Sequence, residues 1–183
     1  MKKVKIALLV LIATVLVLPA CKKGADDPFI SLRSRDGRME GNWTLSAVTG
    51  THVDYATTNT TTSVTYNGSV YTSTTTGSNP QSATGTYTMV ISKHGVATWS
   101  SSIAQGGTSD VQTGSGEWYW SNSDKNKEYF YVDGAGNNGF FPGGTTFYVD
   151  KCSHSTMILE SNTESITNGV GSSDNYTFTF TRQ

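Results

Sequence analysis

The stretch GNWTLSAV, residues 41–48, begins the folded part of the chain and decides its fold class. From Trp43 to Ala47 apolar and polar residues alternate, which is the pattern of a β-strand with one buried face. The last stretch, YTFTFTR (residues 176–182), alternates in the same way and places Arg182 in the apolar register. A first strand with a Trp and a last strand with an Arg predict a closed sheet in which the two ends of the chain meet and the guanidinium lies on the indole.

The same alternation continues through the rest of the chain, with Gly, Asn, Ser and Asp between the alternating segments. No stretch of ten residues has the apolar periodicity and caps of a helix. We expect tight turns at His94-Gly95 and at Cys152-Ser153-His154. These features predict an all-β fold, an antiparallel up-and-down barrel of about eight to nine strands, with a β-sandwich as the alternative. The expected strands are residues 41–48, 63–75, 84–93, 96–103, 109–121, 127–133, 145–151, 155–160 and 174–182.

The alternation also assigns one face of these strands to a core. The opposite face consists largely of Thr and Ser, with Glu117. The apolar face carries enough material for one core. Its members are Trp43, Leu45, Tyr87, Met89, Ile91, Trp118, Trp120, Met157, Leu159, Phe178 and Phe180.

Residues 1–20 have the features of a secretory signal peptide, because a basic start is followed by an apolar run over residues 6–18 that is too short to span a membrane as a stable helix. The following letters LPAC, residues 18–21, resemble the lipobox of bacterial lipoproteins, in which the cysteine is diacylated and becomes the acylated N-terminus. The resemblance implies that Cys21 is lipidated and anchors the chain in a membrane, since each buried methylene contributes about 0.8 kcal/mol. The alternative is an ordinary cleaved signal peptide with a chance cysteine.

Residues 21–38 are charged and rich in turn-forming residues, which predicts a lipidated tether in front of a barrel domain at residues 39–183. The residue after Cys21 is Lys22 and not Asp. By resemblance to lipoprotein sorting rules, this disfavours retention in the inner membrane. We therefore expect an outer-membrane lipoprotein that faces either the periplasm or the cell surface.

Removal of residues 1–20 leaves 163 residues, enough for one domain with a tether. Three of the 13 basic residues and none of the 14 acidic ones leave with the signal, so the net charge becomes −4. This charge argues against nucleic acid as a partner. Cys152 is then the one cysteine of the domain, so its core forms without an internal disulfide.

Gly41-Asn42-Trp43 opens the first expected strand and Arg182 ends the last one. Between them lie GEWYW at residues 116–120 and the expected hairpin over residues 147–159. In this order the motifs resemble those of lipocalins, a calycin-type family, and of short lipocalin-like bacterial lipoproteins, over most of residues 39–183. The Thr-Asp-Tyr motif of typical lipocalins and their C-terminal helix are missing, so the resemblance is to a lipocalin-like domain. It implies that Gly41, Trp43 and Arg182 form the structural signature that closes the barrel.

The resemblance also implies a small apolar ligand inside the barrel, because about eight strands leave an interior just wide enough for one. Large side chains can fill the same interior instead. Both possibilities remain open from the sequence. In the second, the protein is a structural or protein-interaction module of the envelope that acts through loops such as residues 134–144. The expected ligand-binding residues are Tyr87, Met89, Trp118, Trp120, Phe178 and Phe180.

Several patterns with chemical meaning lack the context that they require. Residues 134–139 spell Gly-x-Gly-x-x-Gly, but the Phe-Phe-Pro-Gly-Gly that follows cannot start the helix of a dinucleotide site. His52 with Asp54, and Cys152 with His154, each provide only half of a metal site. No serine-hydrolase elbow or carboxylate pair is present. We therefore expect no catalytic residue, metal or cofactor, and a protein that is not an enzyme.

Overall fold

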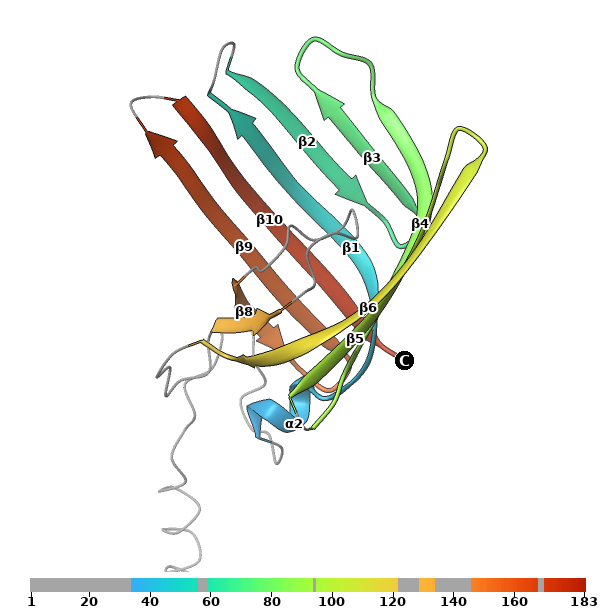
Figure 1. Cartoon of the computed structure of the whole chain (residues 1–183), viewed down its shortest axis with the longest axis vertical. Helices are drawn as coiled ribbons and strands as arrows, with labels where there is room; N and C mark the ends of the chain where they lie inside the picture. Colours follow the sequence, from blue (N-terminus) through green and yellow to red (C-terminus); the bar gives the residue numbers. More distant parts are fainter. Residues whose placement is uncertain (1–33, 56–58, 94, 122–128, 134–145, 168–169) are drawn as a thin grey trace, which may run out of the picture.

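The structure is a computed structural model that describes residues 34–55, 59–93, 95–121, 129–133, 146–167 and 170–183. Within these residues ten antiparallel strands form a closed barrel with a short helix at one end (Figure 1). The predicted antiparallel barrel is confirmed, with ten strands in place of the expected eight to nine. Helix α2 (Arg35–Met39) precedes β1 (Gly41–Asp54), β2 (Thr60–Tyr66), β3 (Val70–Thr75), β4 (Gln81–Ile91), β5 (Val96–Gln105), β6 (Thr108–Trp120), β7 (Tyr129–Val132), β8 (Thr146–Cys152), β9 (Thr156–Thr167) and β10 (Val170–Arg182).

The additional strand comes from the segment 63–75, which was expected to be one strand and is the hairpin β2–β3. The Asn67 carboxamide oxygen accepts hydrogen bonds from the backbone N–H groups of Ser69, at 3.2 Å, and Val70, at 2.9 Å. Gly68, which directly follows Asn67, has φ +93°, a conformation that favours glycine. An Asn-Gly pair between alternating residues is a strong hairpin signal, and the sequence prediction missed it here.

The barrel has a closed half and an open half. In the closed half, next to α2, residues 41–44 of β1 pair directly with β4, and eight strands form a complete ring: β1 and β4 to β10. In the open half, residues 48–54 of β1 pair with β2 instead, so that the β2–β3 hairpin lies between β1 and β4. The short strands β7 and β8 lie in the closed half. Beyond them, in the open half, residues 108–117 of β6 pair only with β5, and residues 161–167 of β9 pair only with β10, within the described part of the chain.

The closed half contains the apolar core. All eleven residues expected on the apolar face are buried there, Trp120 partly and the others almost completely. The core also includes residues that the sequence prediction did not place in it: Trp99, Phe130, Val132, Phe147 and Val149 in the closed half, and Val48, Val64 and Tyr66 where the open half begins.

A bulge in β1 changes which residues face the interior. The pairing of β1 with β10 shifts by one residue between Leu45 and Ala47, and Val48, not Ala47, is the next fully buried residue. The strict alternation from Trp43 to Ala47 is therefore wrong beyond Leu45. An extra residue in one strand moves every later residue of that strand to the opposite face of the sheet. His52 therefore points inward, on the same face as Val48.

The two ends of the chain meet at the closed end, as predicted. The Arg182 guanidinium carbon lies 4.6 Å from the centroid of the Trp43 ring. The Trp43 indole N–H donates to the Met39 carbonyl at 2.7 Å, and an Arg182 Nη2–H donates to the Arg38 carbonyl. Gly41 has φ +144°, and a Cβ there would lie 3.0 Å from Arg182 Nη1. Gly41, Trp43 and Arg182 therefore lie in contact at the closed end of the barrel.

Residues 35–38, assigned to the tether from the sequence, belong to the barrel in the structure. Arg35 is only 2% exposed, and its Nη2–H donates to the Val149 carbonyl at 2.7 Å. Asp36 accepts a hydrogen bond from the Trp120 indole N–H. These contacts make residues 35–38 part of the closed end of the barrel. The predicted signal peptide, Cys21 and the rest of the tether lie outside the described residues.

Trp43→Ala should lower the free energy of unfolding by about 3–5 kcal/mol, because it removes a fully buried ring and leaves a cavity. Urea denaturation measures this loss, and Val111→Ala, at a position 65% exposed, is the control with an expected loss below about 1 kcal/mol. A loss below about 1 kcal/mol for Trp43→Ala itself would show that the indole does not hold the closed end together.

Candidate functional site

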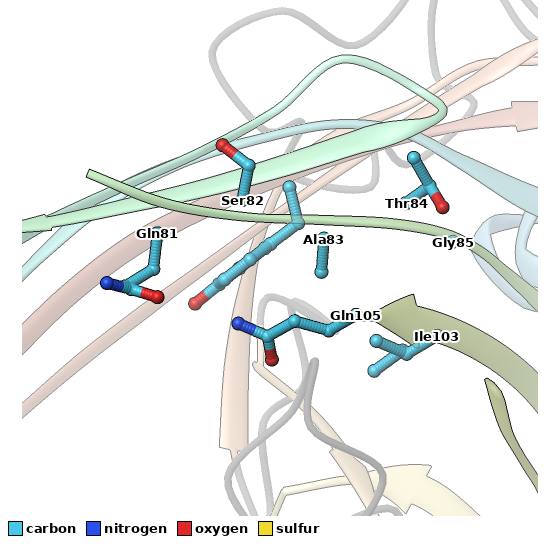
Figure 2. Close-up of a pocket in the computed structure, with 8 residues that line it drawn as sticks. Gln81, Ser82, Ala83, Thr84, Gly85, Ile103 and Gln105 are labelled. Carbon is cyan, nitrogen blue, oxygen red and sulfur yellow. The ribbon is translucent and has the colours of Figure 1, made fainter. Parts of the chain in front are cut away.

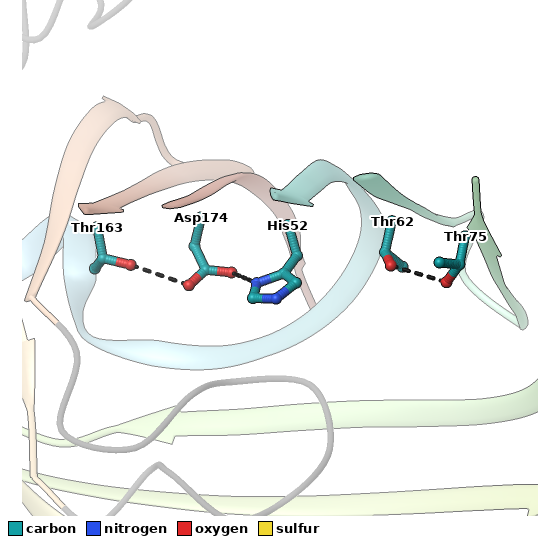
Figure 3. Close-up of polar contacts among 5 residues, drawn as sticks. All are labelled: His52, Thr62, Thr75, Thr163 and Asp174. Atoms are coloured by element: carbon teal, nitrogen blue, oxygen red, sulfur yellow. Dashed lines mark hydrogen bonds and ion pairs between the residues drawn. The ribbon is translucent and has the colours of Figure 1, made fainter. Parts of the chain in front are cut away.

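The interior changes from apolar to polar above the core. At the level of His52, the inward side chains of five neighbouring strands form one line, which we call the polar row (Figure 3). The backbone register places each member opposite the next one. From β9 to β3 the members are Thr163, Asp174, His52, Thr62 and Thr75.

Hydrogen bonds join Thr163, Asp174 and His52 in one group and Thr62 and Thr75 in another. His52 Nδ1 lies 2.8 Å from Asp174 Oδ1, and Thr163 Oγ1–H donates to Asp174 Oδ2 at 3.3 Å. The hydroxyls of Thr62 and Thr75 lie 2.8 Å apart. The row is accessible to solvent, since 39% of the His52 side chain and 26% of the Asp174 side chain are exposed.

Asp174 fixes the orientation of the His52 ring. A neutral imidazole that donates its Nδ1–H to a carboxylate carries a lone pair on Nε2. No described residue forms a hydrogen bond with Nε2 of His52. The ring therefore presents one oriented nitrogen to the interior of the open half.

Two tyrosines lie close to the polar row. The Tyr176 ring covers Gly50, where a Cβ would come within 2.2 Å of the ring, so only glycine leaves room for it. Burial first, and then the charge of Asp174 and the neighbouring Tyr71, raise the pKa of Tyr176 to about 12. Burial also raises the pKa of Tyr71. Both phenols are therefore neutral hydrogen-bond donors at neutral pH.

A cavity of about 180 Å³ lies on the β3–β4–β5 side of the open half (Figure 2). This volume is far above the ~10–15 Å³ that one water molecule requires. Figure 2 shows Gln81, Ala83 and Gln105 on one side of β4 and Ser82 pointing away on the other. Both apolar side chains and the side-chain amides of glutamines therefore line the cavity. The lining consists of Tyr71, Gln81, Ser82, Ala83, Thr84, Gly85, Ile103 and Gln105.

The six residues expected to bind a ligand lie elsewhere. Tyr87 packs edge-on against Phe180 with ring centroids 6.2 Å apart, and Trp118 packs in the same way against Trp120 at 6.3 Å. Met89 and Phe178 are also buried in the core, and none of the six lines the cavity. Bulky side chains from a ring of eight strands fill its interior, so these six residues belong to the packed half of the barrel.

The two possible half metal sites differ in the structure. His52 and Asp54 share the inward face of β1, as the sequence allows, and His52 also contacts Asp174 on the neighbouring strand. Cys152 is fully buried and His154 is exposed. Within the described ranges no group of three or more His, Cys, Asp or Glu side chains is placed to hold a metal ion. The loop at residues 134–144 lies outside those ranges.

Charge is distributed unevenly along the barrel. Among the described residues, every Lys and Arg lies in the closed half or in the turns and helix at its end: Arg35, Arg38, Lys93, Lys151 and Arg182. The inward positions of the open half carry acidic side chains: Asp54, Asp110 and Asp174. The open half therefore favours neutral or cationic molecules over anions.

Four tyrosines form a separate group on the outer face of β6, β7 and β8. Tyr119 packs on Tyr131 with ring centroids 4.8 Å apart, and Tyr129 packs on Tyr148 at 5.7 Å. Tyr119 is 49% and Tyr129 is 47% exposed. We call this group the tyrosine face.

The fold and the site define an antiparallel barrel with one packed end and one open, polar end. Comparison of the chain with family models, with curated proteins and with solved structures finds no match. In the described part of the chain no helix has the length and apolarity needed to cross a membrane. The functional argument therefore rests on the geometry of the site.

Tyr176→Phe tests the environment of the open half. The phenol in the unfolded chain titrates near ~10, below its pKa of about 12 in the fold. Its contribution to stability is therefore complete below about pH 10 and is lost as the pH rises toward 12. The variant should lack the highest-titrating phenol in an ultraviolet titration, and its urea midpoint should fall less steeply over this range. Equal slopes in both proteins would place Tyr176 in open solvent.

Proposed function

We propose that this protein is a lipid-anchored, lipocalin-like protein of the bacterial outer membrane that binds a small molecule in the open half of its barrel, without catalysis. The observation that carries the proposal is the division of the interior. Large side chains fill the closed half, whereas the open half has an accessible wall of oriented polar groups and a cavity of about 180 Å³. Concave sites with a few convergent polar groups are the usual form of small-molecule sites.

The place where the chain enters the barrel gives the proposal an orientation. Ser34, the first described residue, caps α2 at the closed end by accepting a hydrogen bond from the Gly37 N–H. An acylated Cys21 would hold this end near the membrane, because the intervening residues reach at most about 45 Å when extended. The tether would then join the barrel at the end opposite the open half.

The geometry of the polar row favours binding over chemistry. His52 and Asp174 together form a base, but covalent hydrolysis also needs a nucleophile within hydrogen-bond reach of that base. Among the described residues no hydroxyl or thiol is bonded to His52 Nε2. The pair is arranged to present a fixed hydrogen-bonding group to a bound molecule.

The tyrosine face supports a second candidate, a protein-interaction module of the envelope with a filled barrel. Tyrosine is enriched where proteins meet, because its ring is apolar and its hydroxyl makes hydrogen bonds. Tyr119 and Tyr129, about half exposed, have this character. In this alternative the open half is a by-product of the barrel shape.

Cys21→Ala should release the protein from membranes and remove the acyl mass, because the acyl chains on Cys21 are the proposed anchor. Intact-mass measurement and detergent-phase partitioning check this outcome. Cys152→Ala is the matched control and should keep both the lipid and the membrane association, since Cys152 is buried inside the barrel. Cys21→Ala protein that stays in the detergent phase without lipid mass would contradict the proposed anchor.

Nuclear magnetic resonance spectra of the Cys21→Ala protein should change when a dialysable small-molecule extract of bacterial envelopes is added. We expect the shifted backbone signals to lie on β9, β10, β1, β2 and β3 around His52, with the core near Trp43 unchanged. Shifts confined to the closed half, or no shifts at all, would count against small-molecule binding and in favour of the protein-interaction module.

A further inference from the structure

We propose that the ligand of the open half is an uncharged saccharide, held by hydrogen bonds to the polar row with His52 and Asp174 at its centre. This inference rests on the proposed function, since it names the class of small molecule that the same half binds. It replaces the apolar ligand expected from the sequence. Four observations support it.

The first observation is the chemistry of the polar row. Its three threonine hydroxyls can each donate and accept a hydrogen bond, Asp174 accepts, and His52 offers Nε2. A saccharide carries hydroxyls of the same dual kind at short intervals, so it can pair with such a wall at several points. A hydrocarbon chain would leave these groups without the partners that water gives them.

The second observation is the aromatic surface beside the row. The Tyr176 ring packs over Gly50, where the missing Cβ leaves room for it, and Tyr71 is close enough to interact electrostatically with the Tyr176 phenol. Neutral tyrosines offer a flat apolar ring and a hydroxyl together. The faces of a sugar ring are apolar and its edges are hydroxylated, which matches this combination.

The third observation is an unpaired buried hydroxyl next to the same tyrosine. Ser161 lies opposite Tyr176 in the register of β9 and β10, is 0% exposed, and its Oγ has no hydrogen-bond partner among the described residues. Buried hydroxyls in folded proteins almost always have a partner. A ligand hydroxyl in the open half would supply one, directly or through a water molecule.

The fourth observation is charge. Acidic side chains at inward positions of the open half include Asp110 and Asp174, and no Lys or Arg of the described residues lies in that half. These carboxylates repel an anionic ligand. A neutral sugar should therefore bind better than the same sugar with a carboxylate.

The test uses the full-length Cys21→Ala protein and titrations followed by nuclear magnetic resonance. The neutral probes are the methyl glycosides of glucose, galactose, mannose and N-acetylglucosamine. Glucuronate is the matched anion, and N-phenyl-1-naphthylamine, followed by its fluorescence, is the neutral apolar probe. We expect saturable binding of at least one neutral glycoside, at least tenfold weaker binding of glucuronate, and no competition between the glycoside and the apolar probe.

Two pairs of variants locate the binding. His52→Ala and Asp174→Ala remove inward groups, whereas Thr51→Ala and Asn175→Ala change the outward neighbours on the same two strands. The inward variants should weaken glycoside binding at least tenfold and the outward ones less than twofold. Thermal melts check that each variant folds. If an alanine variant does not fold, Thr163→Val, which removes one inward hydroxyl at nearly constant shape, replaces it and should also weaken glycoside binding.

Each remaining result overturns the inference. Binding of the apolar probe or of the envelope extract around His52, with no glycoside binding, would reject a saccharide and keep a small-molecule site. Glucuronate that binds as tightly as the glycosides, or inward variants that bind as well as the outward ones, would also reject it. Failure of every probe and of the extract would reject the proposed function as well.

Discussion

The stacking of the Arg182 guanidinium on the Trp43 indole joins the two ends of the chain, and the rest of the barrel depends on this contact. Both residues are further held by backbone carbonyls of α2, at Met39 and Arg38. The helix is too short to be stable alone, because its first turn fixes several dihedral angles for few hydrogen bonds. Its contacts with the two end strands stabilise it and seal the closed end.

Strand β1 extends this closure into the open half. It pairs with β10 along nearly its whole length, with β4 at the bottom and with β2 higher up. The β2–β3 hairpin thus enters the sheet where β1 and β4 separate, and the barrel turns from a ring with a packed core into a wall with an accessible inner face. The same strand carries Trp43 in the core and His52 in the polar row.

The sequence alone predicted the parts of the fold that depend on local pattern. Alternation identified the barrel and its core face, because burial of one face imposes a period of two. The candidate site depends on features that alternation does not reveal. The bulge after Leu45 reverses the facing of β1 and turns His52 inward, and the contact with Asp174 depends on the register of strands more than a hundred residues apart. Helix α2 was missed because five residues are too few to show helical periodicity.

The short strands β7 and β8 leave the upper parts of β6 and β9 with backbone groups that pair on one side only, within the described residues. Edges of this kind can pair with the same edges of other copies, and such pairing would polymerise the barrels. The edges carry the residues that discourage such pairing: Asp110 and Gly114 on β6 and Glu164 on β9. Barrels of this kind can therefore be crowded together and still remain separate molecules, each with its own open mouth.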